Sequence, residues 1–452
     1  MRIIVCGAGS VGQSIVSYLV KGNNDIAVID NNQRRLDELS KEYDILPVLG
    51  EASHPDVLER AGAKDTELVL AVTDSDEVNM MVCQIAYTLF NIPRKIARID
   101  SEVFLDPIWG GLYNDKHLPI DAIISPDIEI AETILQILQY PGSSGVLPVF
   151  GGQGCVLTIK LSASSPLLNI PLSQLIKQVP ELNIAVVNIL RDGNCFIPDM
   201  YDTFLAGDEI NIFVNQDEIY NTISAFGAEK PSNERLLIFG GNAVAEYLGR
   251  KVEQDDSIIS CKIIEENIDS ARRLAKDLTN TVIINGEMMS DVILNEADIS
   301  HVDAAIALTA NDKDNLLASL LAAQRGVSST LSVVNTPSYN NLIFNIGDST
   351  LIDRSSVTIS KLLKELRKTK MQEAYAISRG NGEIWEILLQ EENACVGKKI
   401  GELNMHKQSR IFAIKRGEEK IFPIPSTQLL VGDIILLYTN STAIRQTENI
   451  FS

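Results

Sequence analysis

Short apolar runs alternate along residues 1–100 with stretches in which apolar residues recur every three or four positions. Such runs are typical of strands in a parallel sheet covered on both faces, and the intervening stretches are typical of helices. The predicted strands are Ile3–Cys6, Ile26–Ile29, Leu46–Leu49, Leu68–Val72 and Ile96–Ile99. The predicted helices are Gln13–Val20, Arg34–Lys41, Val57–Ala61 and Glu77–Phe90. This α/β order predicts a doubly wound Rossmann-type sheet.

The pattern of this first lobe occurs a second time further along the chain, which indicates an internal duplication. Residues 50–79 match residues 286–315 at one constant spacing. The matched pairs in this stretch include Thr73 with Thr309, Asp76 with Asp312 and Asn79 with Asn315. Further upstream, at a different spacing, Gly7 matches Gly240 and Asp30 matches Glu265. The sequence therefore predicts two Rossmann-type sheets.

A second, shorter duplication follows each of these lobes. Leu205–Ile210 resembles Leu430–Ile435, and each segment carries a Gly-Asp pair before an apolar run, which is typical of a tight turn. In the first copy, strands are expected at 156–161, 184–191 and 210–214, and helices at 171–177 and 216–226. The fold class is therefore α/β, with each Rossmann-type sheet followed by a small α+β lobe.

Two amphipathic segments connect the large lobes to the small ones. Asp127–Tyr140 places Ile130, Ile134, Ile137 and Leu138 on one face, and Val357–Arg367 does the same with Ile359, Leu362, Leu363 and Leu366. Each helix either packs on its own sheet or crosses to a partner subunit. The predicted domains are residues 1–124, 143–228, 233–354 and 371–452, with connecting helices at 125–142 and 355–370.

The charge balance argues against nucleic acid as a partner. The chain has 39 Lys and Arg residues against 60 Asp and Glu residues, a net charge of −21. Binding to phosphate backbones needs a basic surface, and no dense Lys/Arg block occurs. No apolar run is long enough for a membrane helix, and the chain opens on a strand pattern instead of a signal peptide. We expect a cytosolic protein; if it lies at a membrane, another protein should hold it there.

The six cysteines and four histidines are scattered along the chain without the short spacings of a zinc site. We therefore expect buried, reduced thiols and no metal.

The strongest candidate for chemistry is the turn after the first strand. Gly7-Ala8-Gly9-Ser10-Val11-Gly12 is a G-x-G-x-x-G motif between a strand and a helix, and Asp30 ends the second strand. Glycines allow the backbone to approach a pyrophosphate at the helix N-terminus, and the carboxylate accepts hydrogen bonds from ribose hydroxyls and repels a 2′-phosphate. The pattern predicts NAD(H) binding in preference to NADP(H), with Thr73 and Asp74 at the same sheet edge.

The matching turn of the second copy is degenerate. It reads Gly240-Gly241-Asn242-Ala243-Val244-Ala245, so Asn242 replaces the second glycine and Ala245 the third, while Glu265 keeps the carboxylate. The Asn242 side chain is expected to crowd a pyrophosphate. Two alternatives stay open: weaker or different nucleotide binding, and a sheet kept for architecture.

A dehydrogenase would need an acid or base beside the nicotinamide, and the small lobes offer no such cluster. The residues leave two functions open at this point, an NAD-dependent oxidoreductase with duplicated Rossmann domains and a nucleotide-free scaffold. We expect the protein not to be an enzyme.

On these residues the chain resembles the TrkA family, the cytosolic regulatory subunits of Trk potassium uptake systems. The resemblance rests on the glycine turn, Asp30, Gly50–Pro55, Ala71–Asn79 and Ile96–Ile99, and on the tandem arrangement of the lobes. It implies RCK (KTN) domains in a ring, most simply a homotetramer, under a TrkH-like potassium-translocating membrane subunit. It further implies a peripheral location on the inner face of the cell membrane. NAD(H) would be a regulatory ligand, with ATP or ADP as competing regulators.

The resemblance also assigns roles to individual residues. Gly7 to Val11 would hold the pyrophosphate, Asp30 the adenosine ribose, and Arg98 would offer a cation to phosphate or to a neighbouring lobe. In the second copy, Gly240 to Val244 and Glu265 occupy the matching positions, but the stretch matching Arg98 reads Ser332-Val333-Val334-Asn335.

Overall fold

The computed structural model describes residues 1–22, 24–178, 182–228, 231–335, 349–367, 373–377 and 381–451. The chain divides into two compact units. The first contains Met1–Glu129 together with Ser355–Glu365, and the second contains Ile130–Arg354 together with Leu366–Ser452.

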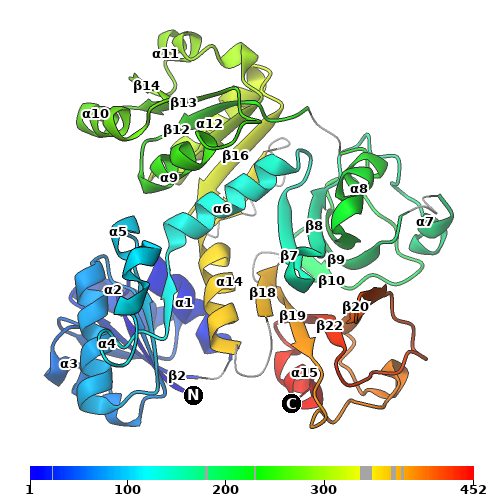
Figure 1. Cartoon of the computed structure of the whole chain (residues 1–452), viewed down its shortest axis with the longest axis horizontal. Helices are drawn as coiled ribbons and strands as arrows, with labels where there is room; N and C mark the ends of the chain where they lie inside the picture. Colours follow the sequence, from blue (N-terminus) through cyan, green and yellow to red (C-terminus); the bar gives the residue numbers. More distant parts are fainter. Residues whose placement is uncertain are drawn as a thin grey trace. The chain divides into compact units, whose positions relative to one another are not determined.

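The first unit, whose N-terminal part is drawn in blue in Figure 1, is built on a parallel sheet. The order of its strands is β3-β2-β1-β4-β5-β6. Its strands are β1 (Arg2–Cys6), β2 (Asp25–Asp30), β3 (Leu46–Leu49), β4 (Leu68–Ala71), β5 (Arg94–Arg98) and β6 (Ala122–Ile124). The helices are α1 (Ser10–Lys21), α2 (Gln33–Glu42), α3 (Pro55–Arg60), η1 (Ala63–Asp65), α4 (Asp76–Phe90), α5 (Glu102–Leu105) and η2 (Pro107–Leu112). The five predicted strands are present, and β6 adds a strand that the sequence pattern did not indicate because it is short.

The second unit contains a matching parallel sheet in the order β14-β13-β12-β15-β16-β17. Its strands are β12 (Arg235–Phe239), β13 (Ser260–Glu265), β14 (Val282–Asn285), β15 (Ala304–Ala307), β16 (Ser329–Val334) and β17 (Thr350–Asp353). The helices are α9 (Ala243–Val252), α10 (Ile268–Asp277), α11 (Asp291–Glu296), η5 (Ile299–His301) and α12 (Asp312–Gln324). The predicted internal duplication is therefore confirmed, because both sheets have the same strand order.

Both small lobes lie in the second unit and consist of antiparallel sheets, ordered β10-β9-β11-β8-β7 and β18-β19-β22-β20-β21. The strands of the first are β7 (Gly145–Val149), β8 (Gly154–Lys160), β9 (Ala185–Arg191), β10 (Asn194–Phe196) and β11 (Glu209–Asn215), with η3 (Phe150–Gly152), α7 (Leu172–Gln178), η4 (Gln216–Glu218) and α8 (Ile219–Ala225). Those of the second are β18 (Glu373–Ile377), β19 (Gly382–Leu388), β20 (Ser409–Arg416), β21 (Glu419–Ile421) and β22 (Ile434–Asn440), with η8 (Ile400–Glu402) and α15 (Ile444–Phe451). The predicted fold class is confirmed.

The duplicated Gly-Asp turns have the conformation that their sequence predicts. Gly207 and Gly432 have φ values of +90° and +86°, where a side chain would be strained. The aspartate that follows each glycine is buried and accepts two hydrogen bonds from one arginine. Arg191 donates to Asp208 at 2.7 Å, and Arg416 donates to Asp433 at 2.8 Å. The arginine partners were not expected from the local sequence.

The two small sheets share one hydrophobic core. Phe150 and Phe213 of the first lobe cluster with Phe412 and Tyr438 of the second. The rings of Phe213 and Phe412 have centroids 6.1 Å apart. The backbone N–H of Phe150 donates to the Glu386 carboxylate at 2.9 Å. The two lobes thus bury their apolar faces against each other within one chain.

Each connecting helix contacts the large lobe of the other copy within the same chain. Helix α6 (Pro126–Gln139) contacts the second Rossmann-type lobe of the same chain, where Tyr247 donates to Glu132 at 2.6 Å and Asn233 donates to the Leu138 carbonyl at 2.9 Å. Ile130, Ile134, Ile137 and Leu138 are buried, as their spacing predicts. The expectation that this helix packs on its own sheet is therefore corrected, whereas packing on a partner subunit stays a prediction.

Helix α14 (Arg354–Arg367) makes the reciprocal contact in the first unit (Figure 1). The hydroxyls of Ser355 and Ser14 lie 2.7 Å apart, and Arg94 donates to the Glu365 carbonyl. Ile359, Leu362 and Leu363 are buried as predicted, whereas the side chain of Leu366 and residues 368–372 lie outside the described residues. The domain boundaries drawn from the sequence stay predictions.

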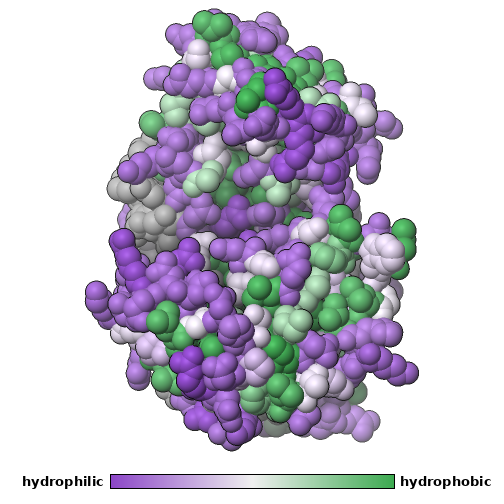
Figure 2. Space-filling view, turned by 90° about the vertical axis from the view of Figure 1, so that its left-hand side faces the viewer, coloured by the Kyte–Doolittle hydropathy of each residue, from purple (hydrophilic) through white to green (hydrophobic). Residues whose placement is uncertain are grey.

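The surface seen in Figure 2 is mostly hydrophilic, as the many charged residues predict, and the cysteines are mostly buried. On the face drawn in Figure 2, hydrophilic residues predominate and hydrophobic residues gather in smaller groups between them. None of the six cysteines, all of which lie among the described residues, forms a disulfide bond. Burial raises the pKa of Cys83, Cys155 and Cys261 to about 12. Among the described residues, no cluster of metal-ligating side chains occurs, and no helix has the length and apolar character needed to cross a bilayer.

Candidate functional site

The turn between β1 and α1 has the geometry that its glycines predict. Gly7 has φ +110°, and a Cβ at this position would lie 2.7 Å from the Val72 carbonyl oxygen. A Cβ at Gly12 would lie 1.9 Å from the Gly7 carbonyl oxygen. Because backbone atoms cannot move aside, both positions require glycine. The close packing brings the end of β4 against the start of α1.

Gly9 differs from its two neighbours because the space beside it is open. The nearest atom to a Cβ built there is Oδ1 of Asp74, at 3.9 Å. Gly9 is the N-cap of α1, and no side chain caps the helix. Uncapped N–H groups at a helix N-terminus attract anions. The open space and the uncapped helix together fit a phosphate group.

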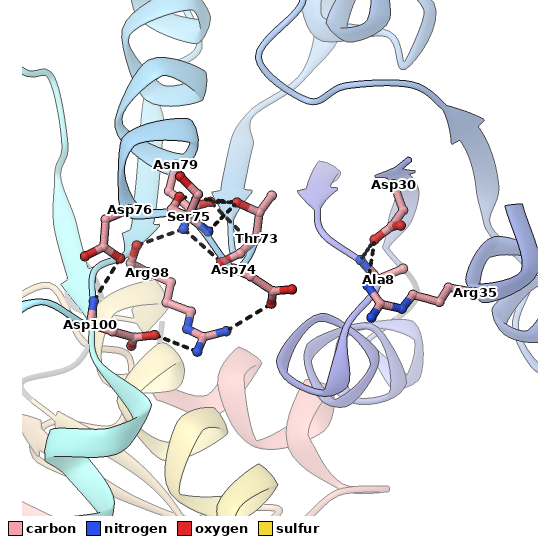
Figure 3. A network of polar contacts seen from close by, with 10 residues as sticks. All are labelled: Ala8, Asp30, Arg35, Thr73, Asp74, Ser75, Asp76, Asn79, Arg98 and Asp100. Carbon is pink, nitrogen blue, oxygen red and sulfur yellow. Dashed lines mark hydrogen bonds and ion pairs between the residues drawn. The ribbon is translucent and has the colours of Figure 1, made fainter. Parts of the chain in front are cut away.

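Asp30 ends β2 beside this turn, as predicted (Figure 3). Its carboxylate accepts a hydrogen bond from the Ala8 N–H at 2.6 Å and another from the Asn32 N–H at 2.8 Å. The side chain is almost fully buried, and Arg35 approaches one oxygen to 4.0 Å. Each oxygen keeps a second lone pair, so the carboxylate can still accept from ribose hydroxyls.

The remaining predicted residues of the first copy lie along the adjoining sheet edge (Figure 3). Thr73 and Asp74 follow β4, and Arg98 ends β5. Arg98 lies 2.6 Å from Asp100 and 3.9 Å from the exposed Asp74. Ser10 and Val11 form the first turn of α1, with Val11 buried. The structure thus brings the first-copy residues to one edge.

The charges at this edge are strongly coupled. Burial works against the charge of Arg98, but the hydrogen bond and the attraction of Asp100 outweigh it, so the pKa of Arg98 is raised. Burial also raises the pKa of Asp100, although Arg98 opposes this effect. The Nε atom of Arg98 and the Oδ1 atom of Asp100 are buried without a hydrogen-bond partner. Arg98 is therefore a permanent cation beside the turn.

The second copy keeps the carboxylate but changes the turn. Gly240 has φ +98°, and Glu265 accepts from the Gly241 N–H at 2.5 Å and from the Asn267 N–H at 2.7 Å. Asn242 fills the place of Gly9: it donates to the Leu308 carbonyl at 2.5 Å and accepts from the Ala245 N–H at 3.1 Å. The helix that begins at Ala243 and Val244 is thus capped by its own side chain, which stands where a phosphate would bind.

Two further groups at these edges were not assigned a role from the sequence. Asp76 accepts from the Asp100 and Ser101 N–H groups at 3.0 and 2.9 Å, and Asn79 is fully buried at the start of α4. The sequence did mark these two positions, because the second copy has the same residue types at the matching places, Asp312 and Asn315. That identity between the copies did not show which backbone groups the two side chains bond to.

Comparison with protein families agrees with this architecture. The TrkA-N domain model matches residues 3–126 and 236–353, and the TrkA-C domain model matches residues 384–452. The first two matches cover the Rossmann-type lobes and the third covers the last small lobe.

Solved structures show the same fold. The GsuK RCK domain has a TM-score of 0.61 at 14% identity, covering 99% of this chain and 94% of that one. The GsuK channel bound to NAD has a TM-score of 0.62 at 14% identity, covering 99% of this chain and 78% of that one.

Curated relatives match along the length of the chain. The Trk system potassium uptake protein TrkA of Azorhizobium caulinodans is 31% identical over 100% of this chain and 98% of its own. The protein of the same name from Vibrio alginolyticus is 33% identical over 85% of this chain and 83% of its own. The chain belongs to the TrkA family of Trk system potassium uptake proteins.

Proposed function

We propose that the chain is a nucleotide-binding regulatory subunit that gates a potassium-translocating membrane protein of the TrkH type. The observation that carries the proposal is the open, uncapped turn at Gly9 with Asp30 beside it. Gly7 to Val11 would bind a pyrophosphate through backbone N–H groups, and Asp30 would bind the adenosine ribose. The family membership supports potassium uptake as the process that is regulated.

NAD(H) is the proposed ligand, with ATP or ADP as competitors at the same turn. The Asp30 carboxylate would repel a 2′-phosphate, which favours NAD(H) over NADP(H). The GsuK channel, which shares the fold, is described with NAD bound, so NADH is the first ligand to test. Arg98 would face the phosphates from the neighbouring strand. The second site, at Gly240 to Val244 and Glu265, would bind a nucleotide more weakly.

The arrangement of the first unit suggests how a ligand could act at a distance. Helix α14 of the second copy contacts α1 through Ser355 and Ser14, and α1 begins at the proposed phosphate turn. A ligand shifts a conformational equilibrium through its differential affinity for the two states. A coupling of about 1–3 kcal/mol would change the open probability of a channel several-fold to a hundred-fold.

The proposed assembly is a homotetrameric ring, located in the cytoplasm and held at the membrane by the partner. An oxidoreductase is the competing proposal. The residues beside the turn do not favour it, since Asp74 and Asp100 are both held in ion pairs with Arg98. Consumption of NADH absorbance with a candidate substrate would support the oxidoreductase instead.

The test is potassium flux in vesicles that contain a TrkH-type subunit and this chain. Wild-type protein is expected to change the flux when NADH, ATP or ADP is added. Gly9→Val protein should still associate with the vesicles but lose the response, because the valine side chain fills the space beside the turn. A flux that ignores both the nucleotide and the added subunit would contradict the proposal.

A further inference from the structure

Asn79 makes four hydrogen bonds from one buried side chain (Figure 3). Its carbonyl oxygen accepts from the Thr73 N–H at 2.9 Å and from the Thr73 hydroxyl at 2.7 Å. Its amino group donates to the Thr73 carbonyl at 3.1 Å and to the Arg98 carbonyl at 2.9 Å. A side-chain amide has two acceptor and two donor positions, so its full capacity is used.

These bonds join the ends of two neighbouring strands. Thr73 lies just beyond β4 and Arg98 ends β5, whereas Asn79 belongs to α4. Asp76, one turn earlier on the same helix, adds bonds to the Asp100 and Ser101 N–H groups beyond β5. The start of α4 therefore holds the loop after each strand in place.

The loop that Asn79 bonds to, Thr73–Asp74, lies next to the glycine turn. The Thr73 N atom would lie 3.0 Å from a Cβ at Gly7, and Oδ1 of Asp74 is the nearest atom to a Cβ at Gly9. A small displacement of Thr73 would therefore alter the space in which a phosphate is proposed to bind. The Arg98 carbonyl accepts from the same Asn79 amide, and the Arg98 guanidinium lies 3.9 Å from Asp74.

The second copy contains the same network at a turn that its own side chain fills. Asn315 is fully buried and bonds to Thr309 at 2.7, 2.7 and 2.9 Å and to the Val333 carbonyl at 2.8 Å. Equal networks imply equal contributions to the stability of each lobe. Only the first of the two networks lies beside an open turn. Comparing the same substitution in both copies therefore distinguishes a role in stability from a role in ligand binding.

We propose that Asn79 is a positioning residue of the nucleotide site, which sets the distance between the Thr73–Asp74 loop and the glycine turn without touching the ligand. The proposal rests on the proposed binding of NADH to the first lobe. A buried amide with all four positions satisfied rigidifies the groups that it joins, and truncating it leaves the Thr73 N–H and two carbonyls without that partner.

The experiment compares Asn79→Ala with Asn315→Ala in the full-length chain. Both substitutions should lower the melting temperature by similar amounts, because both remove the same four bonds from a buried site. NADH titration by calorimetry, well below both melting temperatures, should show a dissociation constant raised about ten-fold for Asn79→Ala and unchanged for Asn315→Ala. Hydrogen exchange at residues 73–75 should accelerate in Asn79→Ala without ligand. If an alanine variant does not fold, Asn79→Ser and Asn315→Ser provide the same comparison.

The outcomes distinguish this proposal from the one on which it rests. If wild-type protein binds NADH and Asn79→Ala binds it equally well, the positioning role is wrong and the proposed site stands. If both variants weaken NADH binding equally, the effect is general destabilisation and the positioning role is also wrong. If wild-type protein binds no NADH, or only Asn315→Ala loses affinity, the site assignment fails and this proposal fails with it.

Discussion

At the scale of single residues, the two copies differ in the side chain at the start of the helix that follows the glycine turn. Gly9 leaves open space at the start of α1, whereas Asn242 caps α9 with its own side chain. Asp30 and Glu265 make equivalent bonds to the Ala8 and Gly241 N–H groups. The difference in proposed ligand binding therefore comes from the turn, not from the carboxylate.

The first prediction concerns the carboxylate. Asp30→Ala should weaken NADH binding by about 1.5–3 kcal/mol, the loss of hydrogen bonds to a charged acceptor. Gly9→Val should weaken it further, since its side chain occupies the proposed pyrophosphate position. Calorimetry measures both effects, with Glu265→Ala as the matched control that should leave the affinity of the first site unchanged. Wild-type affinity in Asp30→Ala and Gly9→Val together would show that the site is misassigned.

The second prediction concerns the degenerate turn. Asn242→Gly removes the side chain that bonds to Leu308 and Ala245, so α9 should start with an uncapped, open turn like that of α1. We expect nucleotide binding at the second lobe to become tighter and to appear as an additional event in calorimetry, while loss of the cap lowers stability by a few tenths of a kcal/mol. Binding curves identical to wild type would show that Asn242 does not control this lobe.

At the scale of elements, the duplicated Gly-Asp turns are held by duplicated arginines. Arg191 also donates to the Thr203 carbonyl, and Arg416 to the matching Gln428 carbonyl, both through Nη2. Each arginine ties the end of a strand to a turn that has little regular structure of its own. A buried aspartate with a bidentate partner is more constraining than a surface ion pair.

The third prediction tests this element. Arg191→Ala should lower the free energy of unfolding by about 3 kcal/mol, because the buried Asp208 carboxylate loses its cation. Arg34→Ala, at an exposed pair with Glu38, is the control and should change it by less than about 0.5 kcal/mol. Denaturant unfolding measures both. Equal, small effects would mean that water replaces the guanidinium at Asp208.

The fourth prediction concerns helix α6. Ile134 is fully buried, so Ile134→Asn should destabilise the second unit by about 2–5 kcal/mol, the range for lost apolar burial and a buried polar group. NADH binding to the first unit should stay within a few-fold of wild type. The exposed Thr442→Asn on the last small lobe is a control. A large loss of NADH affinity without a change in stability would contradict this assignment.

At the scale of the whole molecule, one chain contains two copies of a two-lobe unit whose connecting helices are exchanged. Helix α6 contacts the second large lobe and α14 contacts the first, while the small lobes share a core. Both connecting helices thus make these contacts within one chain.

The fifth prediction follows from this organisation. Light scattering should show a homotetramer, and calorimetry should show one strong NADH site per chain, in residues 1–124. A second event should be weaker, because Asn242 fills the other turn. A monomer at micromolar concentration, or two equal sites per chain, would overturn this description.

The amino-acid sequence by itself determined the two Rossmann-type lobes, the two small lobes, and the pairing of a glycine turn with Asp30. These features depend on local periodicity and on residues that a turn requires, such as Gly7 and Gly12, so they can be derived without coordinates. The duplication also marked Asp76 and Asn79 as retained positions.

Only the tertiary structure decided which lobe each connecting helix covers and which atoms Asn79, Arg191 and Asn242 hold. An apolar stripe such as that of Ile130, Ile134 and Leu138 specifies that a face is buried but not against which partner, because hydrophobic burial has no direction. Hydrogen bonds have direction, but their partners lie on strands brought together by the fold. Sequence spacing therefore cannot show that Asn79 joins Thr73 to Arg98.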